Sequence, residues 1–280
     1  MLLPAVTGLS VFVLWPLARS IYLSFYQWNF YTDNVFVGWK NFADVLGDPK
    51  FAASVIRGLL FTAMVVPLQL LIAFAFASVA RSVGPRMAGA LKMTIYIPTV
   101  VSTVIASLIF VVIYQFSGGV ANWLVGLAGA EPQAWLGDAA WALRAMTVPT
   151  IWIGLGLTSL IMLAGMLDVP ESYYDSARLD GAGWIRQQIY ITLPLMKNVF
   201  LYLLITGFTV TIQQFEIPLV MTSGGPADST LLPNLLIFRH FRYDDNVGFS
   251  VAAAILLFAV IGSISALVFR LLRSEKATDA

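Results

Sequence analysis

The chain has 280 residues, of which 59% are hydrophobic and only 11% are charged, and its formal net charge is +1. So few charged side chains cannot cover a soluble globule of this length, and the composition therefore predicts an integral membrane protein. The nearly neutral balance gives no reason to expect nucleic acid or an acidic polymer as a partner. Cysteine is absent and histidine occurs once, which excludes disulfides and thiol catalysis and leaves little scope for imidazole chemistry.

Six apolar runs are each long enough to cross a membrane, because a helix needs roughly 20 residues to span a hydrocarbon core about 30 Å thick. We therefore predict an all-α integral membrane protein, with residues 1–280 forming a single transmembrane domain. The six predicted transmembrane helices cover residues 2–25, 58–80, 93–116, 145–167, 198–221 and 247–269.

The first run carries one charged residue, Arg19, near its far end, where the side chain is expected to reach the lipid headgroups. No basic region or small-residue cleavage motif precedes this run, so a cleaved signal peptide is not expected. Residues 27–57, which include FVGWKNF and LGDPKF, are predicted to form an ordered segment outside the membrane. The second run contains Pro67 and is predicted to kink there.

A short connection with Arg81, Arg86 and Lys92 separates the second run from the third, and such a basic turn favours the cytoplasm. The third run is predicted to be one helix with Pro98 in its first turns, ended by the sequence SGG. The segment between the third and fourth runs is interrupted by glycine and proline and is rich in tryptophan. It is therefore predicted to form interfacial helices and loop.

The sequence DVPESYYDSARLDGAGWIRQQIYITLP, residues 168–194, is the longest charge-bearing stretch between two apolar runs, and it predicts two short helices. Asp168 and Glu171 have the spacing of a capping box, with Pro170 in the first turn. The glycines at 181 and 183 suit a left-handed residue that ends the first helix. The second helix covers residues 184–190 and ends before Leu193-Pro194.

The fifth run carries Gln213, Gln214 and Glu216 near its end, and two interpretations stay open. Glu216 either faces water at the end of the helix or lines a polar route together with the two glutamines. On a continuous helix Gln213 and Glu216 share one face, and their hydrogen-bonding capacity suits an uncharged polyol or sugar. His240, in the charged loop that follows, is expected to be a solvated surface residue.

Six transmembrane helices place both termini on one side, and the distribution of basic residues indicates which side this is. The termini, the 81–92 connection and the 168–198 segment together hold nine Lys and Arg in short segments close to helix ends, against seven on the other side. Because basic residues near helix ends favour the cytoplasm, we place both termini and the 168–194 segment there. The nine are at positions 81, 86, 92, 178, 186, 197, 270, 273 and 276, and the seven at 19, 40, 50, 57, 144, 239 and 242.

Sequence motifs for catalysis are missing. There is no GxxxxGK[ST] phosphate loop, no His/Asp/Glu cluster with metal-ligand spacing, and no Ser/His/Asp set. We therefore expect no enzyme, no bound metal and no cofactor on this chain. The shortage of ionisable residues within the apolar runs also argues against a stand-alone ion-coupled carrier, which remains the alternative.

The 168–194 segment resembles the cytoplasmic coupling loop, or EAA loop, of permease subunits in binding-protein-dependent ABC importers. In the sugar branch of that family the pattern is approximately P-E-x-Y-E-A-A-x-x-D-G-A, followed after a spacer by I-T-L-P. Asp175 and Ser176 depart from the usual Glu and Ala but keep a carboxylate and a small side chain. The matching residues are Pro170, Glu171, Tyr173, Ala177, Asp180, Gly181, Ala182, Ile191, Thr192, Leu193 and Pro194.

Other parts of the chain support the same resemblance. Leu3-Pro4, Pro16 and YLSFYQW resemble the first transmembrane helix of the larger type of sugar permease, and FVGWKNF resembles its first outer segment. An outer T-x-GGP-x-x-ST element is typical of the first permease of maltose or glycerol-phosphate systems. Its residues here are Thr222, Gly224, Gly225, Pro226, Ser229 and Thr230.

This resemblance implies a permease subunit of an ATP-driven importer that moves a sugar or related polyol across a prokaryotic inner membrane. The implied partners are a second permease subunit, two ATP-binding subunits that carry the ATP and Mg, an extracytoplasmic solute-binding protein and the lipid bilayer. The helix at 171–182 would sit in a cleft of one ATPase, stiffened by an expected ion pair between Asp175 and Arg178. The implied coupling residues are Glu171, Tyr173, Asp175, Ser176, Ala177, Asp180, Gly181, Ala182, Leu193 and Pro194.

Overall fold

The computed structural model describes residues 3–31, 33–244 and 246–272, and these residues are mostly helical, as predicted. A two-stranded antiparallel sheet pairs Tyr26 with Phe36 and Gln27 with Val35. In chain order the elements are α1 (Leu3–Leu9), η1 (Ser10–Leu14), α2 (Trp15–Leu23), β1 (Tyr26–Gln27), β2 (Val35–Phe36), α3 (Lys40–Gly47), α4 (Pro49–Ser82), α5 (Pro85–Tyr96), η2 (Ile97–Val100), α6 (Thr103–Ile113), α7 (Val120–Leu127), α8 (Ala139–Ala145), α9 (Thr147–Leu167), α10 (Glu171–Leu179), α11 (Trp184–Gln187), η3 (Gln188–Thr192), α12 (Leu193–Leu195), α13 (Lys197–Ile212), α14 (Glu216–Thr222), α15 (Pro233–Tyr243) and α16 (Val247–Leu272).

Among the described residues, four helices are long and apolar enough to cross a membrane, and two bent helix pairs bring the number to six if each pair is one span. The four are Leu3–Leu23, Pro49–Ser82, Ala139–Leu167 and Val247–Leu272. The helix Pro49–Ser82 starts earlier than predicted, since residues 49–57 were expected outside the membrane as part of an extramembrane segment. Asp48 begins this helix by accepting a hydrogen bond from the backbone N–H of Lys50 at 2.9 Å, and the helix continues through Pro67.

The prediction of one helix over residues 93–116 is wrong, because the chain bends by 94° between Pro85–Val100 and Thr103–Ile113. The helix begins at Pro85, so Pro98 lies inside it rather than in its first turn. There proline lacks the backbone donor and its ring clashes with the preceding turn. The chain accordingly tightens into the 3₁₀ helix η2 and becomes extended at Val101 before α6 begins.

The predicted helix over residues 198–221 is also broken. α13 ends at Ile212, and α14 begins at Glu216 after three residues that are not helical. A continuous helix would put Pro218 in its interior, whereas the break places Pro218 in the first turn of a new helix, where its missing N–H costs little. At its other end α13 follows Trp184–Leu195 at an angle of 71°.

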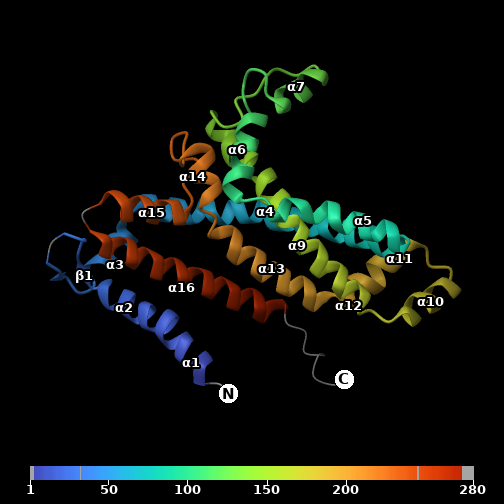
Figure 1. Ribbon diagram of the computed structural model, residues 1–280, viewed down its shortest axis with the longest axis horizontal. Helices are drawn as coiled ribbons and strands as arrows, with labels where there is room; N and C mark the ends of the chain where they lie inside the picture. Colours follow the sequence, from blue (N-terminus) through green and yellow to red (C-terminus); the bar gives the residue numbers. More distant parts are fainter. Residues whose placement is uncertain (1–2, 32, 245, 273–280) are drawn as a thin grey trace.

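α4 lies at the centre of the bundle and packs against α9 and α13 (Figure 1). Two glycines in the middle of α9 permit this close approach. The side chain of Gln69 donates from Nε2 to Thr158 Oγ1 at 2.7 Å, and a Cβ at Gly154 would lie 2.7 Å from that same Nε2. A Cβ at Gly156 would lie 2.4 Å from Thr99 Oγ1 of η2. The glycines therefore decide how closely α9 meets α4 and η2.

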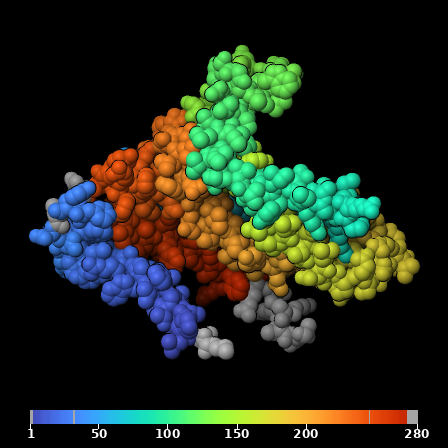
Figure 2. Space-filling view, viewed as in Figure 1, coloured from blue at the N-terminus to red at the C-terminus, as the bar shows by residue number. Residues whose placement is uncertain are grey.

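The two ends of the bundle differ. The β hairpin, α3 and α15 lie at one end of α4 and α16, and α10, α11 and α12 lie at the opposite end (Figure 1). Beside α16, the side chains of Leu3–Leu23 are exposed or half-buried along their whole length. Figure 2 shows the α7 region of the chain projecting from the bundle, while α6 below it packs against α14.

Candidate functional site

The 168–194 segment folds as four short helical pieces, α10, α11, η3 and α12. α10 begins at Glu171 with Pro170 as its N-cap, while Asp168 is the C-cap of α9, which ends at Leu167. The predicted capping box from Asp168 to Glu171 is therefore wrong. Val169 lies between the two helices and is buried in the core. Asp168 therefore belongs to the end of α9 and not to the first turn of α10.

Gly181 ends α10 in the left-handed conformation that its sequence predicts, with φ of 76°. Its backbone N–H donates to the carbonyl of Arg178 at 3.0 Å, and the N–H of Ala182 donates to the carbonyl of Ala177 at 2.8 Å. These bonds satisfy carbonyls that would otherwise lack a partner at the helix end. The turn then directs the chain into α11, whose N-cap is Gly183.

Charged side chains on α10 form a connected set. Arg178 donates from Nη1 to Asp175 Oδ1 at 2.7 Å, as expected from their spacing, and from Nη2 to Glu171 Oε1 at 2.8 Å. The other oxygen of Glu171 accepts from Arg81 Nη2 at 2.8 Å. Since Asp175, Glu171 and Arg178 are more than half exposed, the two pairs on α10 itself stabilise it by under about 1 kcal/mol in total.

Large apolar side chains of this segment point into solvent. Leu179 is 90% exposed, and Tyr173, Trp184, Ile185 and Tyr190 are also exposed. Several large apolar side chains exposed close together in the sequence, outside the long apolar helices, are typical of a surface that binds another protein. Of the residues implied by the resemblance, Glu171, Tyr173, Asp175, Ser176, Asp180, Gly181, Leu193 and Pro194 are exposed, and Ala177 and Ala182 are half-buried.

Two further residues of this end, Tyr174 and Arg81, were given no role from the sequence. Tyr174, only 2% exposed, packs under the guanidinium of Arg81 and approaches Thr192 Oγ1 with its hydroxyl oxygen at 2.9 Å. The sequence signal for Tyr174 is weak, because Tyr173 beside it is equally aromatic and only the helix register decides which of the two is buried. Arg81 was read only as part of a basic connection, 90 residues before Glu171 in the chain.

Gln213, Gln214 and Glu216 lie together at the break between α13 and α14, but not on one helix face. Gln213 Nε2 donates to the carbonyl of Thr209 at 2.8 Å, and Gln214 Oε1 accepts from the N–H of Phe215 at 3.1 Å. Gln213 and Glu216 are exposed, and Gln214 is half-buried. The break therefore offers side-chain amides and a carboxylate to solvent, next to unwound backbone.

The 222–230 loop is held by its own hydrogen bonds. The hydroxyl oxygens of Thr222 and Thr230 are 2.7 Å apart, and Thr230 Oγ1 donates to the carbonyl of Gly225 at 2.8 Å. Gly224 has a φ of 83°, and the bond between Gly225 and Pro226 is cis. Thr222, Gly224, Gly225 and Pro226 thus shape a closed loop.

Arg239 of α15 binds two residues of this loop. Arg239 pairs with Asp228, Nη1 to Oδ1 at 3.3 Å, and donates from Nη2 to the carbonyl of Ser223. His240, expected to be a solvated surface residue in a loop, is half-buried, with its ring centroid 4.6 Å from that of Phe249. It lies in the helix α15, which packs along α16, and not in a loop.

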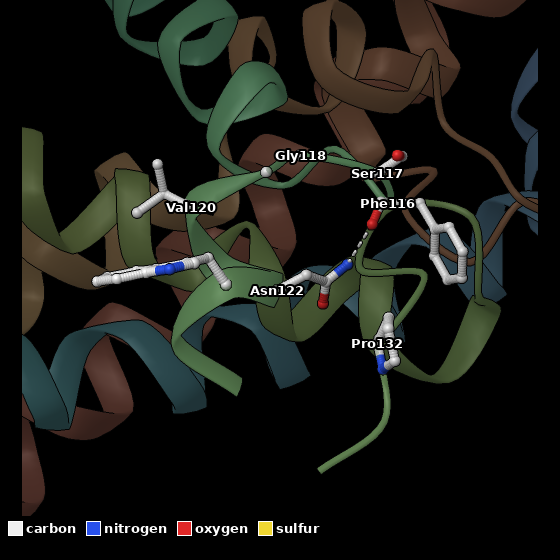
Figure 3. A pocket seen from close by; sticks show the side chains of 8 residues that line it. Phe116, Ser117, Gly118, Val120, Asn122 and Pro132 are labelled. Carbon is white, nitrogen blue, oxygen red and sulfur yellow. Dashed lines mark hydrogen bonds between the residues drawn. The ribbon is translucent and has the colours of Figure 1, made fainter. Parts of the chain in front are cut away.

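A cavity of about 670 Å³ lies at the base of α7 and is lined by Phe116, Gly118, Asn122, Trp123 and Pro132 among others (Figure 3). Asn122 holds this region together. Its Nδ2 donates to the carbonyls of Phe116 at 3.1 Å and Gln133 at 3.0 Å. Its Oδ1 accepts from the N–H of Gln133 and from Trp135 Nε1, both at 2.9 Å.

The fold and these sites together define a class: a multi-span helical membrane protein that presents a short, capped helix and exposed apolar side chains at one end. In the part of the chain described by the structure, no group of three or more His, Cys, Asp or Glu is placed to hold a metal ion. Residues 42–276 match the family described as the inner membrane component of binding-protein-dependent transport systems, and the chain belongs to this family. It is an importer permease subunit rather than an enzyme or a stand-alone carrier.

Characterised relatives cover nearly the whole chain. The sulfoquinovosyl glycerol transport system permease protein SmoG of Agrobacterium fabrum is 31% identical, over 98% of this chain and 90% of its own length. The trehalose/maltose transport system permease protein MalF of Thermococcus litoralis is 30% identical, over 93% of this chain and 88% of its own length. The crystal structure of a bacterial ABC transporter that imports the acidic polysaccharide alginate contains a chain with the same fold. Its TM-score is 0.84 at 21% identity, over 99% of this chain and 94% of that one.

Proposed function

We propose that this chain is one of two permease subunits of an importer for a sugar or a related polyol, driven by ATP hydrolysis on two separate subunits. The observation that carries the proposal is the 31% identity to a sulfoquinovosyl glycerol permease over 98% of the chain, together with similarity to trehalose/maltose and lactose permeases. All three are named for solutes rich in hydroxyl groups. ATP and Mg would bind to the ATPase partners and not to this chain.

The orientation that we propose places both termini and α10–α12 in the cytoplasm of a prokaryotic cell. It is supported by basic residues near helix ends, which favour the cytoplasm. The end of the bundle that carries α10 (Figure 1) includes the last turn of α4, α11 and the start of α13. Together with α10, these elements hold Arg81, Arg178, Arg186 and Lys197. The opposite end would then meet the solute-binding protein. In a related alginate transporter, solved in complex with a pentasaccharide-bound periplasmic protein, the matching chain has a TM-score of 0.81.

Co-purification tests this assembly. A tagged copy of the chain, purified in mild detergent from its own cells, is expected to bring down a second permease and an ATPase. In vesicles, this complex should take up a labelled disaccharide or glycosyl glycerol only when ATP and the binding protein are supplied. Recovery of a lone homodimer, or uptake driven by an ion gradient without ATP, would contradict the proposal. The chain alone should hydrolyse no ATP.

We further propose that Gln213, Gln214 and Glu216 line the solute route at the break between α13 and α14. Replacing any one of them by alanine should lower uptake about two- to tenfold, the loss expected for one neutral hydrogen bond or somewhat more. Initial uptake rates in vesicles measure this. Gln115→Ala, at another exposed glutamine beyond α6, should leave uptake unchanged. Normal uptake by the triple alanine variant would remove this route from consideration.

A further inference from the structure

Arg81, in the last turn of α4, makes two contacts with α10. Its guanidinium carbon lies 3.9 Å from the centroid of the Tyr174 ring, and its Nη2 lies 2.8 Å from Glu171 Oε2. The side chain is only 17% exposed. An exposed ion pair alone would contribute little. Here the planar guanidinium is stacked on one aromatic side chain while its edge is bonded to another residue of the same helix, a geometry that a flexible ammonium does not reproduce.

Two more buried hydrogen bonds complete this end of the molecule. Ser78, one turn before Arg81, donates from its hydroxyl to Gln188 Oε1 at 3.1 Å. The hydroxyl oxygen of Tyr174 lies 2.9 Å from Thr192 Oγ1. Ser78, Gln188 and Thr192 are all buried.

These contacts connect three elements in pairs. α4 binds α10 through Arg81 and binds η3 through Ser78, while α10 binds η3 through Tyr174. Three elements joined pairwise by directional contacts cannot move relative to one another without breaking at least one contact. These contacts therefore favour movement of α10, the end of α4 and η3 together.

We propose that Arg81 is a positioning residue that joins α10 to the central helix α4, so that a displacement of α10 by the ATPase moves α4 with it. In this assignment Glu171 serves the contact with Arg81 inside the chain, and the exposed side chains of Leu179, Trp184 and Ile185 are left for the ATPase. The inference rests on the proposed function, because it takes α10 to be the element that the ATPase moves.

The test uses the complete transporter in vesicles, with its second permease, its ATPase and its binding protein, and measures ATP hydrolysed per solute taken up. Arg81→Gln is expected to raise this ratio about fivefold, and Glu171→Gln to raise it less, because it removes the ion pair but leaves Arg81 stacked on Tyr174. The double variant should match Arg81→Gln, because that variant has already lost the ion pair. Arg81→Lys, which keeps the charge but loses the planar fork, should give an intermediate ratio. Arg86→Gln makes the same charge change at an exposed arginine that has no ion pair in the described part of the chain, and should give the wild-type ratio.

The outcomes separate the two proposals. A wild-type complex with no ATP-dependent uptake contradicts the proposed function. A coupled wild type with a wild-type ratio in Arg81→Gln overturns the role of Arg81, as does a ratio in the double variant that multiplies the two single effects. If Arg81→Gln does not assemble, the other two single variants decide: wild-type ratios in both Arg81→Lys and Glu171→Gln overturn the inference.

Discussion

Replacing Gly156 by valine is expected to prevent the chain from reaching its folded state in normal yield. A Cβ at this position would lie 2.4 Å from Thr99 Oγ1, 2.7 Å from the carbonyl oxygen of Ile95 and 3.0 Å from the Cα of Tyr96. The hydroxyl of Thr99 can rotate away, but the backbone of Ile95 and Tyr96 cannot without moving α5 and η2. Overpacking a well-packed interior costs about 1–3 kcal/mol even where side chains adjust, so we expect at least the upper end of that range.

The measurement is the apparent melting temperature of the purified chain in detergent, together with its yield from the membrane. We expect Gly156→Val to lower the melting temperature by about 5–10 °C, and Gly156→Ala by less. Gly262→Val is the matched control, because Gly262 is also inside a long apolar helix and its Cβ would meet no described atom within 4 Å. If Gly156→Val melts like the wild type, α9 does not pack closely against η2.

The second large effect is expected at Gly181. Its φ of 76° is unfavourable for any residue with a Cβ, by about 1–2 kcal/mol, and a substitution there would favour another path for the chain between α10 and α11. That path would change the relative placement of Leu179 and Trp184. We expect Gly181→Val to reduce solute uptake by the complete transporter at least about tenfold while the assembled complex still hydrolyses ATP, since 1.4 kcal/mol corresponds to a factor of ten.

Gly183→Val is the control for this experiment. Gly183 lies two residues further along, also with no described atom within 4 Å of its Cβ position, but its φ of −68° is ordinary for any residue. If Gly183→Val keeps normal uptake, the loss at Gly181 comes from the left-handed turn. An equal loss in both variants would show that a bulky side chain blocks the partner surface, and normal uptake by Gly181→Val would exclude a coupling role for this turn.

The predicted helices differ from the observed ones mainly at prolines inside the third and fifth apolar runs. The apolar runs predicted helices in the right places, but they did not show where the third and fifth would break. The third helix was predicted to begin at residue 93, with Pro98 in its first turns, whereas it begins at Pro85, thirteen residues before Pro98. The same proline that is tolerated in a first turn interrupts a helix interior, so an error in the helix start changes the predicted shape.

In the 168–194 segment, too, some features follow from the local sequence and others do not. Its left-handed Gly181 and the ion pair between Asp175 and Arg178 follow from spacings of a few residues, and both are present in the structure. The capping box was wrong, because Glu171 is held by Arg81 and Arg178 rather than turned toward the start of its own helix. No local pattern connects Glu171 to a residue 90 positions earlier.

The sequence by itself determined that this is a helical membrane protein, which family pattern it carries, and how the turn after α10 is built. Composition, apolar run length and i to i+4 spacing are sufficient for these, because they depend on solvent and on neighbours along one helix. Only the tertiary structure decided that Tyr174 is buried while Tyr173 is exposed, that α9 approaches η2 at Gly156, and that Arg81 joins α4 to α10. The reason is that each of these depends on which helices become neighbours in space, and helix packing is set by the whole fold rather than by any single segment.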